Sequence, residues 1–180
     1  MNYIGKKVVL NEKENLLVKK EYFVGTERTI SPPETWKNIS AYFKPIGISR
    51  VANITGLDCL NIPVTTAIRP RSKSLCVTAG KGLSLEQAMV SAAMESIEIY
   101  HAENIGQIPF VSSYNQLRER YSLIPFEDLP LRKYSVLNVN LPIRWIIGWD
   151  IINQVEVPVP YDMVTMNFES INAKNNLAYF

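Results

Sequence analysis

One helix-forming segment constrains the fold of this chain more than any other feature of its sequence. The segment spans Leu85–Asn104 and follows a capping pattern formed by Ser84 and Gln87. A surface helix usually carries one apolar stripe and a broad polar face. Here apolar side chains surround most of the helix and leave only a narrow polar stripe. We therefore expect a helix that packs against a sheet and is buried on most of its sides.

The narrow polar stripe contains Ser91, Glu95 and Glu98. At 100° per residue they fall within about 60° of one another. Glutamates three residues apart repel by roughly 0.2–0.5 kcal/mol in water, and burial increases that cost. A cation should offset it, either an arginine or a divalent ion, and carboxylate oxygens suit Mg²⁺ when phosphates complete its shell. The alternative is that both glutamates simply reach water.

The remaining segments predict an α+β fold with a mixed or antiparallel sheet and packed helices. Ser31-Pro32-Pro33-Glu34 is typical of a capped helix start, and Pro45 and Gly47 should end that helix. Residues 1–30 are expected to form a polar lead-in. Runs rich in β-branched and aromatic residues predict strands, and a short helix is expected later in the chain. The strands are expected at 48–54, 63–68, 75–79, 143–149 and 155–159, and the short helix at 114–120.

Composition excludes several classes of protein. The 180 residues contain 19 Lys and Arg against 17 Asp and Glu, so the net charge of +2 favours neither a nucleic-acid nor a lipid partner. No apolar run is long enough to cross a membrane. A cytoplasmic protein without a membrane partner is the expectation. Cys59 and Cys76 lack metal-ligand spacing and are expected in the core, and His101 is expected to be structural, with a role as general base left open.

Several basic and glycine-rich positions are candidate phosphate ligands. Gly80-Lys81-Gly82 precedes the long helix and either presents backbone N–H groups to phosphate or simply provides a small-residue turn. It does not match the Walker spacing. Four arginines are either phosphate ligands or solvated surface charges, namely Arg28, Arg50, Arg69 and Arg71. Trp145 and Trp149 are expected in the core of the later hairpin.

Taken in order, these motifs resemble the YcaO superfamily. The residues that carry the resemblance are Gly25-Thr26-Glu27-Arg28, Ile48-Ser49-Arg50-Val51-Ala52, Arg69-Pro70, Gly80-Lys81-Gly82 and Ser91-Ala92-Ala93-Met94-Glu95-Ser96-Ile97-Glu98. The resemblance implies a lead-in at 1–21 and a YcaO-like domain at 22–180. Family chains are longer, so it also implies the N-terminal half of that fold, truncated before its second half.

The resemblance implies a function as well. YcaO proteins use ATP and Mg²⁺ to phosphorylate a backbone amide oxygen of a peptide, which leads to an azoline or a thioamide. These cyclodehydratase and thioamidation reactions modify peptides, as in bacteriocin biosynthesis. By resemblance, Ser91, Glu95 and Glu98 would contact nucleotide, Glu95 and Glu98 would also hold the metal, and Arg28 would contact phosphate. No catalytic residue is assigned.

Two departures and the chain length keep other functions open. The family often has arginine where this chain has Ile99, and lysine where it has Val24. The alternatives are a non-catalytic YcaO-like module that binds a peptide or partner, and an inactive fragment. The expected partners are a peptide or protein substrate and a protein that presents substrate or sulfur. An exposed apolar surface should lead to a homo-oligomer or a complex.

Overall fold

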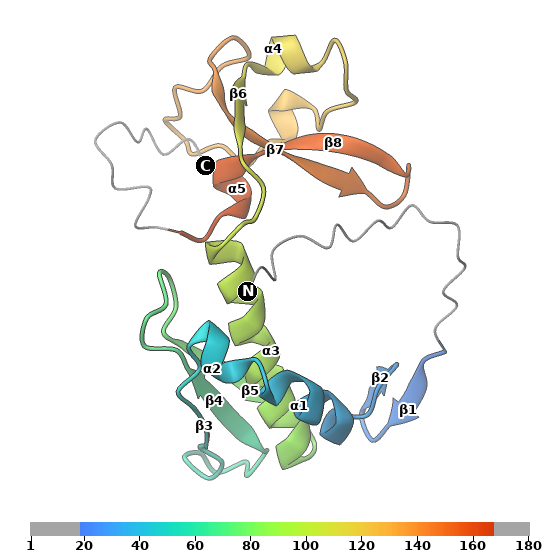
Figure 1. Cartoon of the computed structure of the whole chain (residues 1–180), viewed down its shortest axis with the longest axis vertical. Coiled ribbons are helices and arrows are strands. Elements are labelled where there is room, and N and C mark those ends of the chain that lie inside the picture. The colour runs from blue at the N-terminus through green and yellow to red at the C-terminus, as the bar shows by residue number, and fades with distance from the viewer. Residues whose placement is uncertain (1–18, 168–180) are drawn as a thin grey trace. The chain divides into compact units, whose positions relative to one another are not determined.

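A computed structural model describes residues 19–167 of the chain, which divide after Glu103 into two compact units (Figure 1). Unit 1 ends at Glu103 and unit 2 begins at Asn104. Both combine antiparallel strands with helices, so the predicted α+β class is confirmed. The elements of unit 1 are β1 (Glu21–Phe23), β2 (Thr26–Arg28), α1 (Pro32–Ser40), α2 (Phe43–Ile46), β3 (Arg50–Asn53), β4 (Val64–Ile68), β5 (Val77–Lys81) and α3 (Leu85–Glu103).

The centre of unit 1 is the antiparallel sheet β3-β4-β5 with α3 lying along it (Figure 1). Strand β4 is the middle strand, with Val64 opposite Lys81 and Ile68 opposite Val77 of β5. Helix α3 contacts all three strands, and α1 contacts α3. The predicted packing of the long helix against a sheet is therefore confirmed.

Small residues let α3 approach the sheet closely. Ala88, Ala92 and Ala93 of the helix are fully buried. A Cβ atom added at Gly80 would overlap the backbone nitrogen of Ala92 and the backbone oxygen of Ala88. The Thr78 hydroxyl donates to the Ala92 carbonyl oxygen at 2.8 Å. The contact is thus made between backbones, with almost no side-chain volume between them.

The first part of unit 1 is more structured than the sequence predicts. Strands β1 and β2 form a short hairpin that turns at Gly25, whose φ of 77° favours glycine. The single helix expected up to Gly47 is two helices, with a turn at residues 41–42 between α1 and α2. Trp36 and Phe43 pack edge to face across that turn, with ring centroids 5.1 Å apart. Residues 1–18 of the predicted lead-in lie outside the described residues.

Unit 2 has its own sheet, β6-β7-β8, in which β7 is the middle strand. Its core is formed by Leu117, Leu137, Ile143 and Trp145. The predicted hairpin is present, and both of its turn amides at Ile152 and Asn153 donate to Asp150. The elements are β6 (Phe110–Ser112), α4 (Tyr114–Leu117), η1 (Phe126–Asp128), β7 (Ile143–Asp150), β8 (Val155–Pro160) and α5 (Tyr161–Val164).

Sequence patterns missed the shorter elements of unit 2. Strand β6, η1 and α5 were not expected, and the helix expected at 114–120 ends at Leu117. Strand β8 contains two buried prolines, Pro158 and Pro160, opposite Ile147 and Trp145 of β7. Among the described strands β8 pairs only with β7, so these prolines lie in an edge strand, the position where sheets tolerate proline.

Candidate functional site

The polar stripe of α3 begins beside the sheet and continues onto the exposed surface, since a Cβ atom added at Gly80 of β5 would lie 2.8 Å from Ser91 Cβ. Glu95 and Glu98 are exposed and Ser91 is half-buried, whereas Ser96 and Ile99 on the sheet side are buried. The three stripe residues lie at the spacing that makes helix side chains neighbours. The stripe is thus one polar strip along the helix, as its sequence pattern predicts, although Leu85, Glu86, Met94 and His101 are exposed as well.

Of the two alternatives for the glutamates, the structure supports the one in which both reach water. Their side chains lie on the solvent side, and in the part of the chain that the structure describes no ion pair joins Glu95 or Glu98 to a cation. Water screens their repulsion, which is why an exposed pair costs only a few tenths of a kcal/mol, roughly 0.2–0.5. The fold therefore requires no arginine or metal to neutralise them.

The donor set of the stripe nevertheless fits Mg²⁺. Two carboxylates on adjacent turns, with a hydroxyl beside them, offer the hard oxygen ligands that this ion prefers. Over residues 19–167 no group of three or more His, Cys, Asp or Glu side chains gathers around one point. Mg²⁺ is commonly bound by one or two carboxylates and completes its shell with water and phosphate oxygens. The stripe therefore fits a magnesium–phosphate ligand better than a bare ion.

Within residues 19–167, no hydrogen bond or ion pair joins Arg28 to the stripe. The β1–β2 hairpin joins the start of α3 through its turn, where the Gln87 side-chain amide donates to the Val24 carbonyl oxygen at 2.7 Å. Arg28 lies half-buried at the other end of the hairpin, opposite Glu21. Its role toward phosphate stays a prediction.

The Gly80-Lys81-Gly82 triplet is explained by packing. Gly80 and Lys81 belong to β5, and the Gly82 N–H donates to the Pro63 carbonyl oxygen at 3.2 Å. A Cβ atom at Gly82 would lie 2.5 Å from Gln87 Cβ, so this glycine also permits close approach of the helix. Because neighbours in a strand alternate faces, Lys81 points to the opposite side from Gly80. Of the two readings left open for this triplet, the small-residue turn is the one the structure supports.

Arg69 is neither a solvated charge nor an available phosphate ligand. It is 3% exposed, and its Nη1 lies 2.6 Å from Oε2 of Glu103 at the C-terminal end of α3. Arg50 and Arg71 are exposed. The sequence does carry a signal for a buried glutamate, since Glu103 falls on the sheet-facing side of the helix among apolar residues, but it does not identify the partner of that glutamate.

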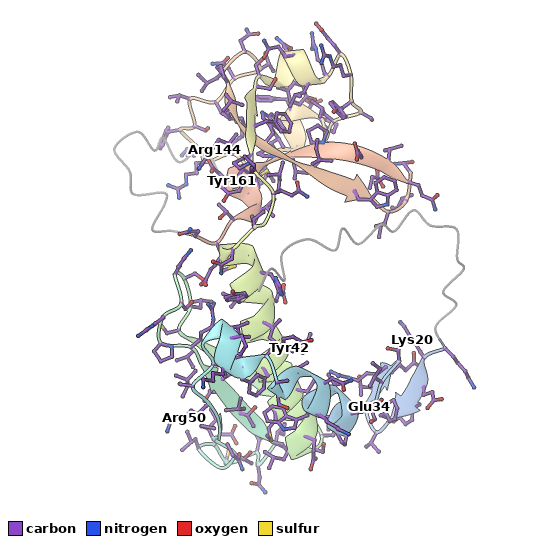
Figure 2. All side chains as sticks on the ribbon, in the orientation of Figure 1. Lys20, Glu34, Tyr42, Arg50, Arg144 and Tyr161 are labelled. Atoms are coloured by element: carbon purple, nitrogen blue, oxygen red, sulfur yellow. The ribbon has the colours of Figure 1, made fainter. Side chains whose placement is uncertain are left out.

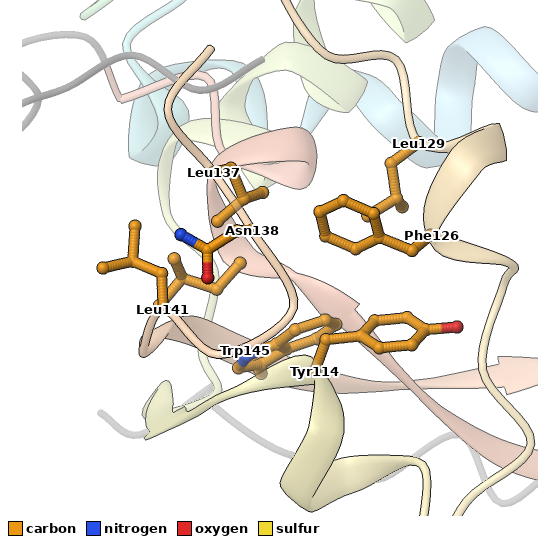
Figure 3. A pocket seen from close by; sticks show the side chains of 8 residues that line it. Tyr114, Phe126, Leu129, Leu137, Asn138, Leu141 and Trp145 are labelled. Atoms are coloured by element: carbon orange, nitrogen blue, oxygen red, sulfur yellow. The ribbon is translucent and has the colours of Figure 1, made fainter.

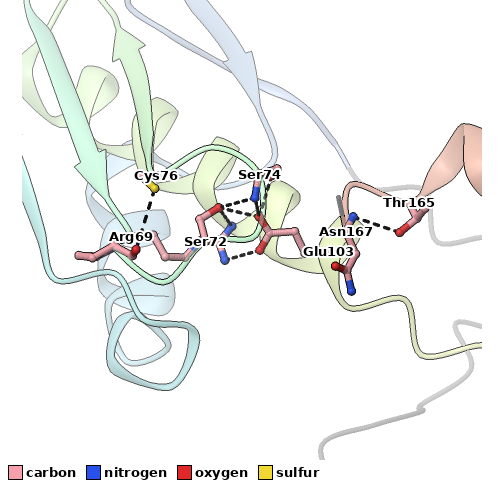
Figure 4. Close-up of polar contacts among 8 residues, drawn as sticks. Arg69, Ser72, Ser74, Cys76, Glu103, Thr165 and Asn167 are labelled. Atoms are coloured by element: carbon pink, nitrogen blue, oxygen red, sulfur yellow. Dashed lines mark hydrogen bonds and ion pairs between the residues drawn. The ribbon is translucent and has the colours of Figure 1, made fainter. Parts of the chain in front are cut away.

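The Glu103 carboxyl group is strongly acidic. Burial by itself would raise its pKa, but hydrogen bonds from Arg69, Ser72 and Ser74 and the Arg69 charge lower the pKa to about 2. The carboxylate is therefore ionised at neutral pH. It is a structural anion, because its oxygens are directed to protein donors (Figure 4).

The remaining candidates lie outside the stripe or do not support a site. Cys59 and Cys76 were expected in the core, but both are exposed free thiols. Both belong to connecting segments, so their apolar character did not determine their burial. His101 is exposed, and its ring packs edge to face against Tyr100, with ring centroids 5.6 Å apart.

Unit 2 contributes an apolar hollow and one ion pair. The hollow is bounded by core side chains including Trp145 and Tyr114, and no charged residue lines it (Figure 3). Elsewhere Arg144 pairs with Asp162 at 2.6 Å, and its guanidinium lies over the Tyr161 ring, 4.8 Å from the ring centroid (Figure 2). Within residues 19–167, no helix has the length and apolar character needed to span a membrane.

Comparison with known proteins identifies the family. The YcaO cyclodehydratase family, described as ATP- and Mg²⁺-binding, matches residues 79–180. An uncharacterized protein of Mycobacterium tuberculosis is 36% identical over 143 residues, which cover 79% of this chain and 32% of that protein. An uncharacterized protein of Methanothermobacter thermautotrophicus is 34% identical over 139 residues, which cover 76% of this chain and 35% of that protein. The chain thus spans about a third of the length of these curated relatives.

Solved structures agree on the fold. A YcaO protein from Methanopyrus kandleri, bound with AMPPCP and Mg²⁺, superimposes with a TM-score of 0.58 at 24% identity, covering 81% of this chain and 36% of that one. A heterocyclase in complex with substrate and cofactor has a TM-score of 0.62 at 15% identity, covering 83% of this chain and 24% of that one. The family match includes Ser91, Glu95 and Glu98, and both folds correspond over most of residues 1–180. The chain therefore belongs to the YcaO family.

Proposed function

We propose that this chain supplies the magnesium and nucleotide contacts of a YcaO-type enzyme that activates a peptide amide. The observation that carries the proposal is the exposed stripe of Ser91, Glu95 and Glu98 on α3. Carboxylate and hydroxyl oxygens of this kind are ligands that suit Mg²⁺ when phosphate oxygens and water complete its shell. The family's description as ATP- and Mg²⁺-binding supports the choice of ligand.

Each stripe residue has a distinct proposed role. Glu95 and Glu98 hold Mg²⁺ through their carboxylate oxygens, directly or through water, and Ser91 donates a hydrogen bond to a phosphate oxygen. Arg28 neutralises phosphate charge, which is the role that the family resemblance implies for it. The amide oxygen of the peptide would attack the γ-phosphorus of ATP, the bond from that phosphorus to the β-phosphate oxygen would break, and ADP would leave. Such transfers depend mainly on positioning and charge neutralisation, so no general base is assigned.

The product and the substrate belong to the same proposal. Attack on the phosphorylated amide carbon by a neighbouring Cys, Ser or Thr side chain expels phosphate and gives an azoline. Attack by a sulfur donor likewise expels phosphate and gives a thioamide. Either modifies a peptide or protein, as in bacteriocin-type biosynthesis, and we place the reaction in the cytoplasm. The geometry of the stripe does not favour one product over the other, because both share the phosphorylation step.

A partner is part of the proposal because the stripe supplies only two metal ligands. The curated relatives extend well beyond the region that this chain matches. Unit 1 also exposes large apolar side chains, including Leu57 at 84%, Leu60 at 69% and Val77 at 53%. We propose that another polypeptide, or a second copy of this chain, covers such side chains and completes the site.

A second candidate function follows from the same observation. With two protein carboxylates the stripe could hold a magnesium–nucleotide too weakly for turnover. The chain would then be a non-catalytic module that binds a peptide or partner protein, or an inactive fragment.

Isothermal titration of the full chain with AMPPCP and Mg²⁺ tests the proposal. We expect saturable binding that requires Mg²⁺ and is lost in Glu95→Gln and Glu98→Gln, which keep the side-chain shape. Glu86→Gln is the matched control, because Glu86 is an exposed glutamate of the same helix outside the stripe. No binding by the parent chain, or equal loss in Glu86→Gln, would overturn the proposal. Peptide-stimulated release of phosphate from ATP would distinguish the enzyme from the binding module.

A further inference from the structure

A buried polar cluster ties the C-terminal end of α3 to the connection between β4 and β5 (Figure 4). Glu103 accepts hydrogen bonds from Arg69 Nη1 at 2.6 Å, from Ser72 Oγ at 2.6 Å, and from the backbone nitrogen and Oγ of Ser74 at 2.9 and 2.7 Å. Arg69 also donates from Nη2 to Ser72 Oγ at 3.1 Å. The side chains of Arg69 and Glu103 are 3% and 1% exposed. We term Arg69, Ser72, Ser74 and Glu103 the polar clamp.

Besides its general packing against β3, β4 and β5, α3 makes specific contacts at two places, of which the clamp is the second. The first is the close backbone approach at Gly80, together with the hydrogen bond from Thr78 to the Ala92 carbonyl oxygen. Glu95 and Glu98 lie on the helix between these two attachments. Any rotation of α3 about its own axis would therefore move both carboxylates.

The first attachment has little to resist such rotation. It consists of glycine and alanine surfaces, which present few projecting side chains that could interlock, and of a single hydrogen bond from the Thr78 hydroxyl. The clamp is different, because four donor groups converge on one carboxylate from fixed directions. A buried ion pair is weak support for stability, since its desolvation offsets much of its attraction. The geometry of the clamp, however, fixes the direction in which the Glu103 side chain leaves α3.

We propose that the polar clamp is a set of positioning residues that fixes the rotation of α3, and with it the direction in which Glu95 and Glu98 face. This inference rests on the proposed function for its consequence, although the clamp can be tested without it. A helix with its side chains has a radius of about 5–6 Å, so a 10° rotation moves a carboxylate by about 1 Å. Ligand sites need their groups held to within about 0.5 Å. Loss of the clamp should therefore weaken magnesium–nucleotide binding without touching the stripe.

The test uses variants of the full chain. Glu103→Gln removes the charge at constant shape, and the double variant Ser72→Ala/Ser74→Ala removes two side-chain donors while keeping the ion pair. Asp162→Asn is the matched control, since it breaks the Arg144 ion pair of unit 2. Affinity for AMPPCP with Mg²⁺ is measured by titration at a temperature where circular dichroism shows every variant folded. Hydrogen exchange of segments 69–76 and 92–103 is measured in parallel.

We expect Glu103→Gln to weaken binding of the magnesium–nucleotide at least tenfold and the double serine variant about threefold to tenfold, with Asp162→Asn unchanged. Exchange should accelerate in both clamp segments of the two clamp variants. A folded Glu103→Gln chain that binds as tightly as the parent would overturn the inference. Should Glu103→Gln fail to fold, the double serine variant decides by the same criteria.

The clamp and the proposed function fail in different ways. If the parent chain binds no magnesium–nucleotide, the proposed function is wrong, and the clamp is judged by hydrogen exchange alone. In that case unchanged exchange of segments 69–76 and 92–103 in Glu103→Gln would reject the clamp. Faster exchange there, with no change in Asp162→Asn, would support it as the device that holds α3.

Discussion

The interiors of the two units are packed in opposite ways. In unit 1 the helix and the sheet meet through residues that have almost no side chain, and polar groups at the end of the helix complete the contact. In unit 2 the interior is filled by a tryptophan and branched aliphatic side chains, with aromatic rings around them. The central residues of unit 1 are Gly80, Ala88, Ala92 and Ala93, and those of unit 2 are Leu117, Leu137, Ile143 and Trp145.

This difference predicts opposite sensitivities. A contact between backbones cannot accept added atoms, because the atoms it would displace cannot rotate away. A core of large side chains cannot lose atoms without leaving a cavity. Unit 1 should therefore fail when residues are enlarged and unit 2 when they are reduced.

The largest effect is expected from Gly80→Val. Its Cβ would overlap the backbone of Ala88 and Ala92, so α3 must separate from the sheet, at about 4 kcal/mol or more. Hydrogen exchange resolved by peptide should show unit 1 unprotected. Gly148→Ala in β7 is the control: its Cβ would lie 3.3 Å from the Val157 carbonyl oxygen, and we expect a cost below about 1 kcal/mol. Comparable protection of unit 1 in Gly80→Val and the parent would contradict the comparison.

Trp145→Ala should have the next largest effect, in unit 2. Trp145 is 2% exposed, and its indole N–H donates to the Ser112 carbonyl oxygen at 2.9 Å. Truncation should lower the free energy of unfolding of unit 2 by about 3–4 kcal/mol. Urea denaturation measures this loss of free energy of unfolding when it is followed by far-ultraviolet circular dichroism, which reports on the backbone and not on tryptophan. The half-buried Trp149 of the same strand is the control, and an equal loss in Trp149→Ala would argue against a core centred on Trp145.

Acid should weaken unit 1 through Glu103. Its folded pKa of about 2 lies below the ordinary value of 4.5, so the stabilisation is complete above pH 4.5 and is lost as pH falls toward 2. Its size is about 2–3 kcal/mol. In urea titrations at several pH values, Glu103→Gln should be less stable than the parent at pH 7, and the gap should narrow below pH 4.5 and close only as pH falls through about 2. A gap that is independent of pH would show that the carboxylate charge does not matter.

The smallest effects on stability are expected at the stripe. Glu95→Gln and Glu98→Gln each remove one member of an exposed like-charged pair, so without nucleotide each variant should be equally stable or gain up to about 0.5 kcal/mol. Thermal melting without nucleotide measures this. Lower midpoints in both variants, with no effect of nucleotide on the parent, would mean that the glutamates hold the fold instead of binding a ligand.

Local sequence signals predicted the helices that begin with a recognisable capping residue. Ser31 caps α1 through Glu34 N, and Ser84 accepts from Gln87 N as its pattern predicts. The Gln87 side chain departs from the pattern, because it accepts from Leu83 N and donates to Val24 instead of closing the capping box. Short strands such as β1, β2 and β6 were missed, since three residues give too little pattern for a period of two.

The site was predicted only in part, for a physical reason. Helical periodicity correctly places Ser91, Glu95 and Glu98 on one face, because that depends on local geometry alone. It did not show which face meets the sheet, so a buried stripe and a stripe that reaches water both stayed open. Arg69 and Glu103 are 34 residues apart in sequence, and their pairing depends on how the β4–β5 connection returns to the helix. No local pattern contains that information.

The two prolines of β8 have a consequence for how these sheets can grow. A strand added beside β8 would find no N–H at Pro158 or Pro160, so this edge offers few donors for further pairing. The outer strands β3 and β5 contain no proline, and among the described strands each pairs only with β4. An added strand, whether from another segment or from another chain, can therefore extend the sheet beneath α3 more readily than it can extend the sheet of unit 2.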